Sequence, residues 1–309
     1  MPVKKRAVKA KEAATSTRRP RARSAKVAAA PKAVRSKPAR AKVTRAKAAS
    51  AKSSPMAARR AHEEFLLEVT SLPTAAGRED RVIEFIERWV AARAERCVLS
   101  RDRFGNLTIA QHGFLEACAK GARPIMITAH LDHPAFVVTA VRVRRTTAEL
   151  DLEFRGGVND PYFKGAALEV FDRDTRASFA ARIVSLDATT DPAKKPFKTV
   201  VARLAKAKDA GAIAPGSIAR WKFPRAEVKE GLAHTHACDD LAAAAAALVA
   251  FDRISRDVAL AHVALLFTRS EEIGFIGAIG AARGGTVPQG PGPRGRAARL
   301  PREFPQFPA

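Results

Sequence analysis

Three short motifs in this chain carry the side-chain types that bind metal ions. They are HLD at residues 130–132, CDD at residues 238–240 and SEEIG at residues 270–274. Zinc binds histidine nitrogen and carboxylate oxygen, and a catalytic zinc site keeps one position for water. A pair of metal ions needs a bridging carboxylate, ligands for each ion and a base for the water between them. A histidine, an aspartate and a pair of glutamates supply these roles.

Each motif alone also has a simpler explanation. A single histidine after a strand is more often a packed or surface residue. The pair Asp239-Asp240 suits the N-cap of a helix, and acids such as Glu271-Glu272 favour a helix start through its dipole. The placement of all three favours a site, because each lies at a strand end or helix start, where parallel α/β sheets hold active sites. In HLD, Asp132 can reach back to the second imidazole nitrogen of His130 and fix its tautomer.

The elements that must position these motifs are visible in the hydrophobic pattern. PIMIT (124–128) predicts a buried strand directly before HLD, and VALAHVALLFT (258–268) predicts another directly before SEEIG. DLAAAAAALVAFDRI (240–254) predicts a helix that CDD enters. Two earlier helices are predicted at residues 62–72 and around 82–90, followed by a turn at DRFGN (102–106) between two short strands.

A different sequence pattern, typical of short β-strands, interrupts this α/β pattern. Short alternating runs such as FVVTAVRV and ELDLEF, separated by turn clusters, predict a small β-rich domain with one helix near residues 197–208. We therefore predict an α/β fold, a mixed sheet with flanking helices, that a β-rich insertion divides. The predicted parts are a basic tail (1–60), the two halves of the α/β domain (61–140 and 233–282), the insertion (141–232) and a low-complexity end (283–309).

The charge of the chain is concentrated at its ends. Residues 1–60 hold 20 of the 55 Lys and Arg and a single acid, a net charge of +19, and residues 283–309 add +4. Residues 61–282 have a net charge of +1 and read as an ordinary globular sequence. The first 60 residues contain no aromatic residue, Leu or Ile, so they predict a disordered tail. Such a tail is similar to those of linker histones and favours nucleic-acid backbones, although a merely solubilising tail is equally consistent.

Cysteine usage and hydropathy indicate the compartment. Cys97, Cys118 and Cys238 are scattered, with no CxxC spacing, which favours reduced thiols. No apolar run reaches the roughly 18 residues that a membrane span requires, and the N-terminus lacks the apolar core of a secretory signal. We predict a cytoplasmic protein that does not enter membranes.

Over residues 65–277 the chain resembles the tetrahedral aminopeptidases, which include glutamyl and deblocking aminopeptidases. The resemblance rests on FLLEVTSLPTAAGREDRVIEFI, DRFGN, ITAHLDHPAF, HACDDLAAAAAAL and FTRSEEIGFIGA, which occur in the order of the family. It implies a zinc-exopeptidase-like α/β domain whose insertion serves dimerisation. It also implies peptide substrates cleaved at free N-termini, and a homo-oligomer.

The resemblance further implies roles for single residues. His130 would be a terminal ligand of one of two divalent metal ions, most simply zinc, with cobalt as an in vitro substitute. Asp239 would bridge the ions, Glu272 would bind the second, Glu271 would be the general base and Asp132 the partner of His130. Two positions depart from the family, since His133 replaces a glutamate, and Cys238, where the family has no ligand, is expected to be a small buried residue.

The C-terminal region departs further. The family places another acidic ligand and a final histidine after the glutamate pair, whereas here only Glu303 is acidic after Glu272 and no histidine follows His262. After residue 279 the composition changes abruptly to Gly, Pro and Arg, which predicts a shifted reading frame. The alternative is a degenerate paralogue, and either would leave low activity. Two rival functions also stay open: another dizinc exopeptidase or amidohydrolase, and a nucleic-acid-associated protein with an inactive peptidase-like body.

Overall fold

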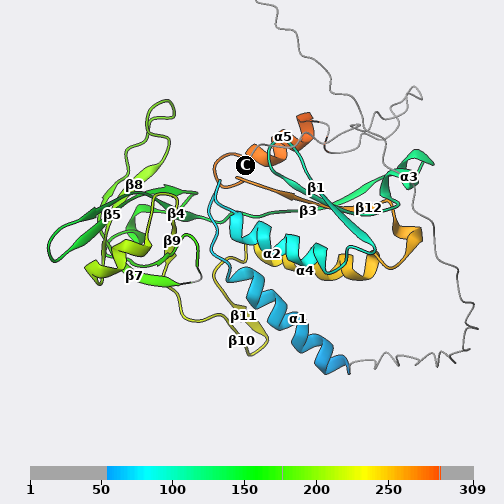
Figure 1. Cartoon of the computed structure of the whole chain (residues 1–309), viewed down its shortest axis with the longest axis horizontal. Helices are drawn as coiled ribbons and strands as arrows, with labels where there is room; N and C mark the ends of the chain where they lie inside the picture. Colours follow the sequence, from blue (N-terminus) through cyan, green and yellow to red (C-terminus); the bar gives the residue numbers. More distant parts are fainter. Residues whose placement is uncertain (1–53, 176, 285, 287–309) are drawn as a thin grey trace, which may run out of the picture. The chain divides into compact units, whose positions relative to one another are not determined.

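The computed structural model describes residues 54–175, 177–284 and 286 of the 309-residue chain (Figure 1). The predictions for residues 1–53 and 287–309 lie outside these residues. The first helix, α1, begins at Pro55, earlier than the sequence pattern indicates, because Ser54 caps it by accepting a hydrogen bond from the Ala57 N–H at 3.2 Å. None of the described helices is long and apolar enough to cross a membrane.

The described part of the chain has the predicted α/β fold with a β-rich insertion. Its mixed sheet has the strand order β1-β2-β12-β3, with β12 antiparallel to β2 and parallel to β3. The strands are β1 (Cys97–Arg101), β2 (Leu107–Gln111), β3 (Ile125–His130) and β12 (Val263–Thr268). The helices are α1 (Pro55–Thr70), α2 (Asp80–Ala91), α3 (Phe114–Ala119), α4 (Leu241–Ile254) and α5 (Ile276–Gly284), with a 3-10 turn η3 (Val258–Leu260) before β12.

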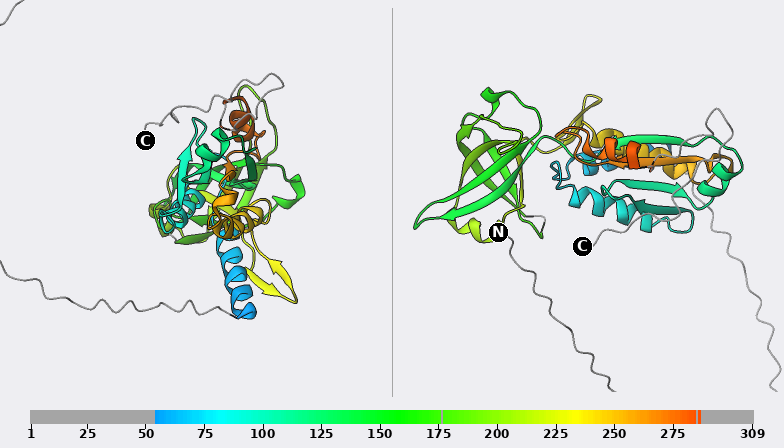
Figure 2. Two further views of the ribbon diagram at one scale, coloured as in Figure 1. Left: turned by 90° about the vertical axis from the view of Figure 1, so that its right-hand side faces the viewer. Right: turned by 90° about the horizontal axis from the view of Figure 1, so that it is seen from above.

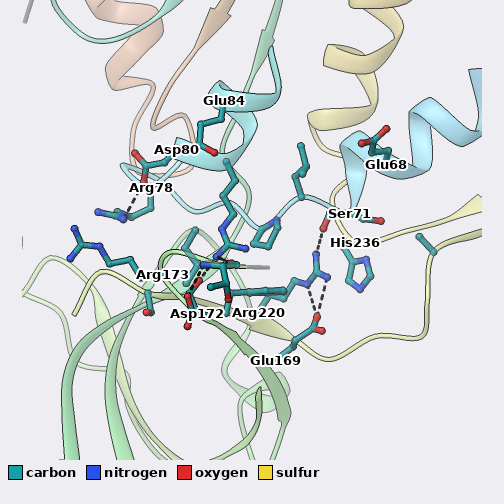
Figure 3. A pocket seen from close by; sticks show the side chains of 18 of the residues that line it. Glu68, Ser71, Arg78, Asp80, Glu84, Glu169, Asp172, Arg173, Arg220 and His236 are labelled. Atoms are coloured by element: carbon teal, nitrogen blue, oxygen red, sulfur yellow. Dashed lines mark hydrogen bonds and ion pairs between the residues drawn. The ribbon is translucent and has the colours of Figure 1, made fainter. Parts of the chain in front are cut away.

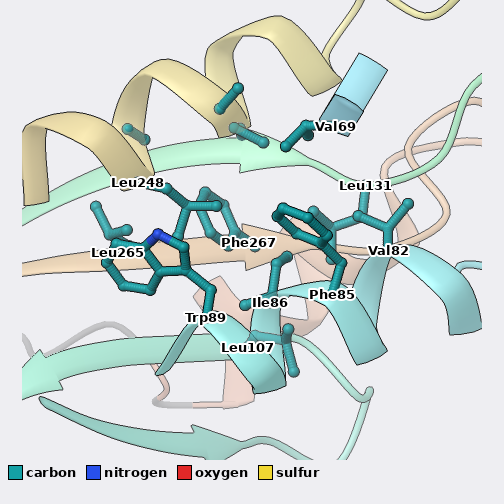
Figure 4. Close-up of a cluster of buried hydrophobic side chains, with 14 of the residues drawn as sticks. Val69, Val82, Phe85, Ile86, Trp89, Leu107, Leu131, Leu248, Leu265 and Phe267 are labelled. Atoms are coloured by element: carbon teal, nitrogen blue, oxygen red, sulfur yellow. The ribbon is translucent and has the colours of Figure 1, made fainter. Parts of the chain in front are cut away.

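Alternation along β12 explains how both faces of the sheet are covered. Leu265 and Phe267 point into the main core with residues of α2 and α4, whereas Ala264 points to the other face, against Phe114 of α3. Figure 4 shows Leu248 of α4 and the α2 side chains meeting β12 in this core. Helices α2 and α4 lie on one face of the sheet and α5 lies on the other (Figure 1).

The insertion is a closed six-stranded barrel. Its strand order is β4-β5-β8-β7-β6-β9, and the strands wrap around one interior (Figure 2). The strands are β4 (Ala135–Val143), β5 (Ala148–Arg155), β6 (Ala167–Phe171), β7 (Ser178–Asp187), β8 (Lys198–Leu204) and β9 (Ile218–Trp221), with 3-10 turns η1 (Asp160–Tyr162) and η2 (Ala207–Ala212). A two-stranded hairpin, β10 (Glu227–Lys229) and β11 (Leu232–His234), follows the barrel.

Two predictions from the hydrophobic pattern are wrong. The helix expected near residues 197–208 is the barrel strand β8, because Val200, Ala202 and Leu204 alternate into the barrel core. The strand PIMIT is not fully buried: Ile125 is 51% exposed, because β3 is the edge of the described sheet and pairs only with β12 among these residues.

One ion-pair cluster ties α4 to the start of β1. Burial alone would raise the pKa of Asp252, but hydrogen bonds from Arg93 (2.5 Å) and Arg256 (2.9 Å) lower it to about 2, and Arg96 lies 2.8 Å away. The folded-state pKa lies below the unfolded value of about 3.9, so this cluster stabilises the fold above about pH 4 and loses that effect as the pH falls through about 2.

Asp252→Asn is therefore expected to lower the free energy of unfolding by about 1–2 kcal/mol at neutral pH. The deficit should shrink as the pH falls from about 4 towards 2, because the wild-type carboxylate then becomes protonated as well. Urea unfolding of both proteins at a series of pH values measures this. A deficit that stays constant at every pH would contradict the assignment to this carboxylate.

Candidate functional site

The topology of the sheet brings two of the three motifs together. Strands β3 and β12 are parallel neighbours, and their register pairs Thr268 with His130 at the carboxyl end of each strand. HLD therefore begins where SEEIG also begins, although the two are far apart in the sequence. Glu271 and Glu272 lie in the turn that joins β12 to α5, which starts only at Ile276, so they are not the first turn of a helix.

Asp132 links these two motifs directly. Its side chain is fully buried, and its two carboxylate oxygens accept hydrogen bonds from the backbone N–H groups of Glu271 and Glu272, each at 3.0 Å. The imidazole of His130 lies against the same residue: Nδ1 is 3.1 Å from the main-chain oxygen of Asp132 and 3.5 Å from its Oδ1. Asp132 thus lies beside the imidazole, and its carboxylate also holds the glutamate turn.

The third motif reaches the site through both aspartates. The Nε2 of His130 lies 3.0 Å from Asp239 Oδ1, and the N–H of His130 donates to Asp240 Oδ2 at 3.1 Å. Asp240 occupies the N-cap position of α4 but makes no side-chain capping bond. Its carboxylate instead accepts a hydrogen bond from the His130 N–H at the end of β3. The simple N-cap explanation therefore does not account for the CDD motif.

The electrostatics of the site indicate an excess of negative charge. Burial, followed by the neighbouring carboxylates Glu271 and Asp132, raises the pKa of Glu272 to about 7. Burial lowers the pKa of His130, but Asp132, Glu271 and Asp240 raise it more, to about 9. Among the described residues, no Lys or Arg pairs with Glu271 or Glu272. A cation in this place would supply the missing positive charge.

The donor atoms also have the right chemistry for a metal ion. One nitrogen of His130 and one oxygen each of Glu271 and Glu272 lie within 4.8 Å of one another. Imidazole nitrogen and carboxylate oxygen are ligands that zinc accepts. Asp239 contacts His130 but is outside this group of three, and its side chain is 81% exposed. The residues present therefore fit a metal ion. Asp239 lies on the solvent-exposed side of this group.

Two neighbouring residues behave differently from each other. His133 is partly buried, which lowers the pKa of its imidazole, and its Nδ1 donates to the main-chain oxygen of Asp239 at 2.6 Å. Cys238 was expected to be buried, and this is wrong, because Cys238 is exposed while its neighbour Ala237 fills the core. All three cysteines are free thiols.

Two residues outside the three metal-binding motifs, Glu79 and Asn106, contact the glutamate turn. Glu79, at the N-cap position of α2, is fully buried and accepts hydrogen bonds from Arg269 Nε at 2.8 Å and Ser270 N–H at 3.0 Å. Asn106 accepts from the Arg269 N–H at 3.1 Å. Ser270 has a positive φ of 56°, which costs a non-glycine residue of order 1 kcal/mol or more.

A separate cleft of about 1220 Å³ lies between α1, α2 and the barrel strands β6 and β9 (Figure 3). Its walls carry both signs of charge, and Arg220 crosses it to bind Glu169 (3.0 Å) and the main-chain oxygen of Ser71 (2.8 Å). His236 lines it and has a buried Nδ1 that has no hydrogen-bond partner among the described residues. None of the candidate metal or catalytic residues lines this cleft, so we place the chemistry at the strand ends.

The described part of the chain thus combines an α/β domain, a barrel insertion and a group of donors that could hold a metal ion. The model of the M42 glutamyl aminopeptidase family matches residues 106–287, more than half of the chain. The protein belongs to this family. The match includes all three motifs and ends shortly after α5. A comparison with curated proteins found no match.

Solved structures of the same fold come from archaeal aminopeptidases. Aminopeptidase APDkam598 from Desulfurococcus kamchatkensis is 23% identical, with a TM-score of 0.54, over 74% of this chain and 61% of that one. A TET aminopeptidase from a marine-sediment Thaumarchaeota archaeon is 17% identical, with a TM-score of 0.55, over 73% and 63%. The TET1 peptidase of Pyrococcus horikoshii, which can assemble into a tetrahedron or an octahedral shell, is 22% identical, with a TM-score of 0.51, over 70% and 63%. The aligned part thus spans less than two thirds of each of these chains.

Proposed function

We propose that this protein is a metallo-aminopeptidase that removes N-terminal residues from peptides. The observation that carries this proposal is the convergence of His130, Glu271 and Glu272 at the carboxyl ends of β3 and β12 in a chain of the M42 family. The excess of negative charge there supports a cation-binding role. The same geometry supports hydrolysis, because it places a carboxylate that can accept a proton beside a group of metal donors.

We assign His130 and Glu272 as terminal ligands of two divalent metal ions, most simply zinc, and Asp239 as the bridging ligand. Bound metal would polarise the scissile carbonyl and lower the pKa of its water. Glu271 is placed to accept a proton from the attacking water and would deliver it to the leaving amine. Asp132 holds the imidazole of His130 and the backbone of both glutamates. A metal ion at Nε2 of His130 would replace the contact of this nitrogen with Asp239, and any proton carried there would be released.

We further propose that this chain holds metal less firmly than a complete dinuclear site. The described residues contribute His130, Asp239 and Glu272 as ligands under this assignment, and a pair of metal ions with an ordered water requires more donors than these three. The assignment agrees with the exposure of Asp239, whose carboxylate is held only from the His130 side among these residues. Low occupancy would limit turnover without changing the chemistry.

Metal content and turnover together test this function. Protein dialysed after loading with zinc is expected to retain fewer than two zinc ions per chain, measured by plasma mass spectrometry. Hydrolysis of aminoacyl reporters is expected to be slow and to stop when a chelator is added. Two tightly held ions with fast turnover would contradict the incomplete site, and chelator-resistant hydrolysis would contradict the metallopeptidase assignment.

The same panel separates this function from its nearest rival, another dizinc exopeptidase or amidohydrolase. Adding N-acylated amino acids and peptides with blocked N-termini to the panel decides between them. Cleavage that requires a free α-amino group supports an aminopeptidase. Release of an acyl group, or of a C-terminal residue, would favour the rival instead.

We also propose that the chain forms a homo-oligomer in the cytoplasm. The TET1 peptidase of Pyrococcus horikoshii assembles into closed shells, and a dodecamer of a TET1 protein is among the similar structures, which supports assembly here. The unpaired cysteines support a reducing compartment. Light scattering of the purified protein measures the mass of the assembly, and a monomer would contradict this proposal.

A second function, nucleic-acid binding, is favoured by one observation, the net charge of +19 on residues 1–60. Such a segment binds phosphate backbones by releasing counterions and does not choose a sequence. Under this alternative the peptidase-like body would only carry the basic segment. Removing the basic segment while keeping the body intact separates the two functions.

A further inference from the structure

The turn that carries the two glutamates is held by side chains from distant parts of the chain. In residues 269–272, four consecutive backbone N–H groups each donate to a side-chain oxygen. The acceptors are Asn106 Oδ1 at 3.1 Å for Arg269, Glu79 Oε1 at 3.0 Å for Ser270, and the two carboxylate oxygens of Asp132 at 3.0 Å for Glu271 and Glu272. These four amides are therefore all held by side chains from outside the turn.

Glu79 is the acceptor whose placement is hardest to explain by folding of its own helix. It occupies the N-cap position of α2 but makes no side-chain capping bond. Its Oε1 accepts from Gly77 N–H at 2.9 Å and from Ser270, and its Oε2 lies 2.8 Å and 2.6 Å from two nitrogens of the Arg269 guanidinium. A fully buried carboxylate is thus directed to residues 269 and 270 across the domain.

On the side opposite Glu79, the Arg269 side chain packs against the DRFGN turn. Gly105 in the DRFGN turn has a φ of 77°, and a Cβ added there would lie 2.6 Å from Nη1 and 3.3 Å from Cδ of Arg269. The left-handed backbone favours glycine here, and a larger residue would require the arginine side chain to shift. Asn106 accepts from the Arg269 N–H with its Oδ1 and donates from Nδ2 to the main-chain oxygen of Gly277 at 2.9 Å. The DRFGN turn therefore supports the glutamate turn at both ends.

We propose that Glu79 is a positioning residue for Glu271 and Glu272, acting through Arg269 and the left-handed backbone of Ser270. This inference rests on the proposed function of the two glutamates. Glu79 touches neither glutamate side chain nor any metal donor. It sets the backbone from which both side chains leave β12, and Asp132 then receives the next two amides. Two buried carboxylates thus share the task of orienting the base and the ligand.

Hydrogen exchange in the full-length protein tests this role without relying on metal or activity. Glu79→Gln keeps the size of the side chain and removes the charge opposite Arg269. The amides of residues 270–272 are expected to exchange at least about tenfold faster, including those of Glu271 and Glu272, which Glu79 does not contact. The amides of residues 263–267 in β12 are expected to keep their wild-type rates.

A matched control removes the charge from another Glu–Arg pair. Glu169→Gln acts on the ion pair with Arg220 in the barrel, which has similar geometry at 3.0 Å, and it should leave exchange in residues 270–272 unchanged. Unchanged exchange in the turn of Glu79→Gln, or an equal acceleration in β12, would overturn the proposal in favour of a purely structural role. Should Glu79→Gln not fold, Glu79→Asp, which keeps the charge but shortens the reach, must give the same local acceleration.

A second readout connects the turn to the metal donors. Titration with cobalt alone, followed by its visible absorption, is expected to give about 10–100-fold weaker binding in Glu79→Gln than in wild type, and no change in Glu169→Gln. Wild-type affinity in Glu79→Gln would count against the positioning role. If the wild-type protein itself bound no cobalt, the proposed function would fail, whereas the exchange experiment would still decide the role of Glu79.

Discussion

Replacing Glu271 by glutamine is expected to lower the rate of reporter hydrolysis by a factor of about 10²–10⁴. Glutamine has nearly the same shape, and the amide N–H that Asp132 holds is unaffected, so the turn should keep its structure. What disappears is the carboxylate that accepts the proton, 3.8 Å from Nε2 of His130. Initial rates of Glu271→Gln and wild type with the same aminoacyl reporter measure the loss.

The metal content of Glu271→Gln separates two roles for this residue. Glu271 is the general base in our assignment, yet one of its oxygens also belongs to the group of donors with His130 and Glu272. A base can be replaced with metal retained, whereas a ligand cannot. Retained zinc with lost turnover supports the base, and lost zinc would make Glu271 a ligand. Glu84→Gln, a substitution on the exposed side of α2, is the control. Full activity in Glu271→Gln would refute both roles of Glu271.

Removing the basic segment is expected to abolish the sequence-independent DNA binding that its charge predicts. A chain that starts at Ser53 loses 18 Lys and Arg and one acid but keeps Ser54, which caps α1. Arg59 and Arg60 stay with the body, where they pair with Glu63 and Glu64. Segments that neutralise about 6–10 phosphates lose roughly 10³–10⁵ in affinity between 50 and 200 mM salt. Full-length protein should show this steep dependence.

Fluorescence anisotropy with a labelled duplex of arbitrary sequence, at several salt concentrations, measures this binding. The shortened chain should bind at least about 10²-fold more weakly at low salt, with an unchanged midpoint of urea unfolding. Equal affinity with and without residues 1–52 would remove the nucleic-acid function. Strong binding that ignores salt would point to a contact other than the phosphate backbone.

The α/β fold was predictable from the sequence because its main signals are local. The helix α4 follows from an alanine-rich run, and β12 from an apolar run that ends just before a polar motif. The β8 strand was mistaken for a helix because Val200, Ala202 and Leu204 face a barrel core whose other walls come from elsewhere in the chain. An alternation of apolar and polar residues in the sequence does not show whether its apolar side faces a core built from distant segments. The edge position of β3 is likewise a property of the whole sheet.

The convergence of His130 and Glu271 at one place was expected, because both follow strands of one parallel pair. The predicted reach of Asp132 to the imidazole also corresponds to a short distance, 3.5 Å, in the structure. Its bonds to the glutamate turn were not foreseen, nor was any role for Glu79 or Asn106. The only sequence signals were a helix-start acid and a turn asparagine, which have common local explanations. Their partners lie 190 and 163 positions away in the sequence.

These long separations fix the order in which the molecule can be completed during synthesis. Glu79 and Asp132 leave the ribosome well before residues 269–272, from which they are separated by 190 and 139 positions in their hydrogen bonds to Arg269 and Glu271. Until β12 inserts between β2 and β3, these two carboxylates have no turn to bind, and burying them would be costly. We therefore expect these two carboxylates to stay hydrated until β12 has been made. The barrel, whose strands are contiguous in the sequence, has no such dependence and can close first.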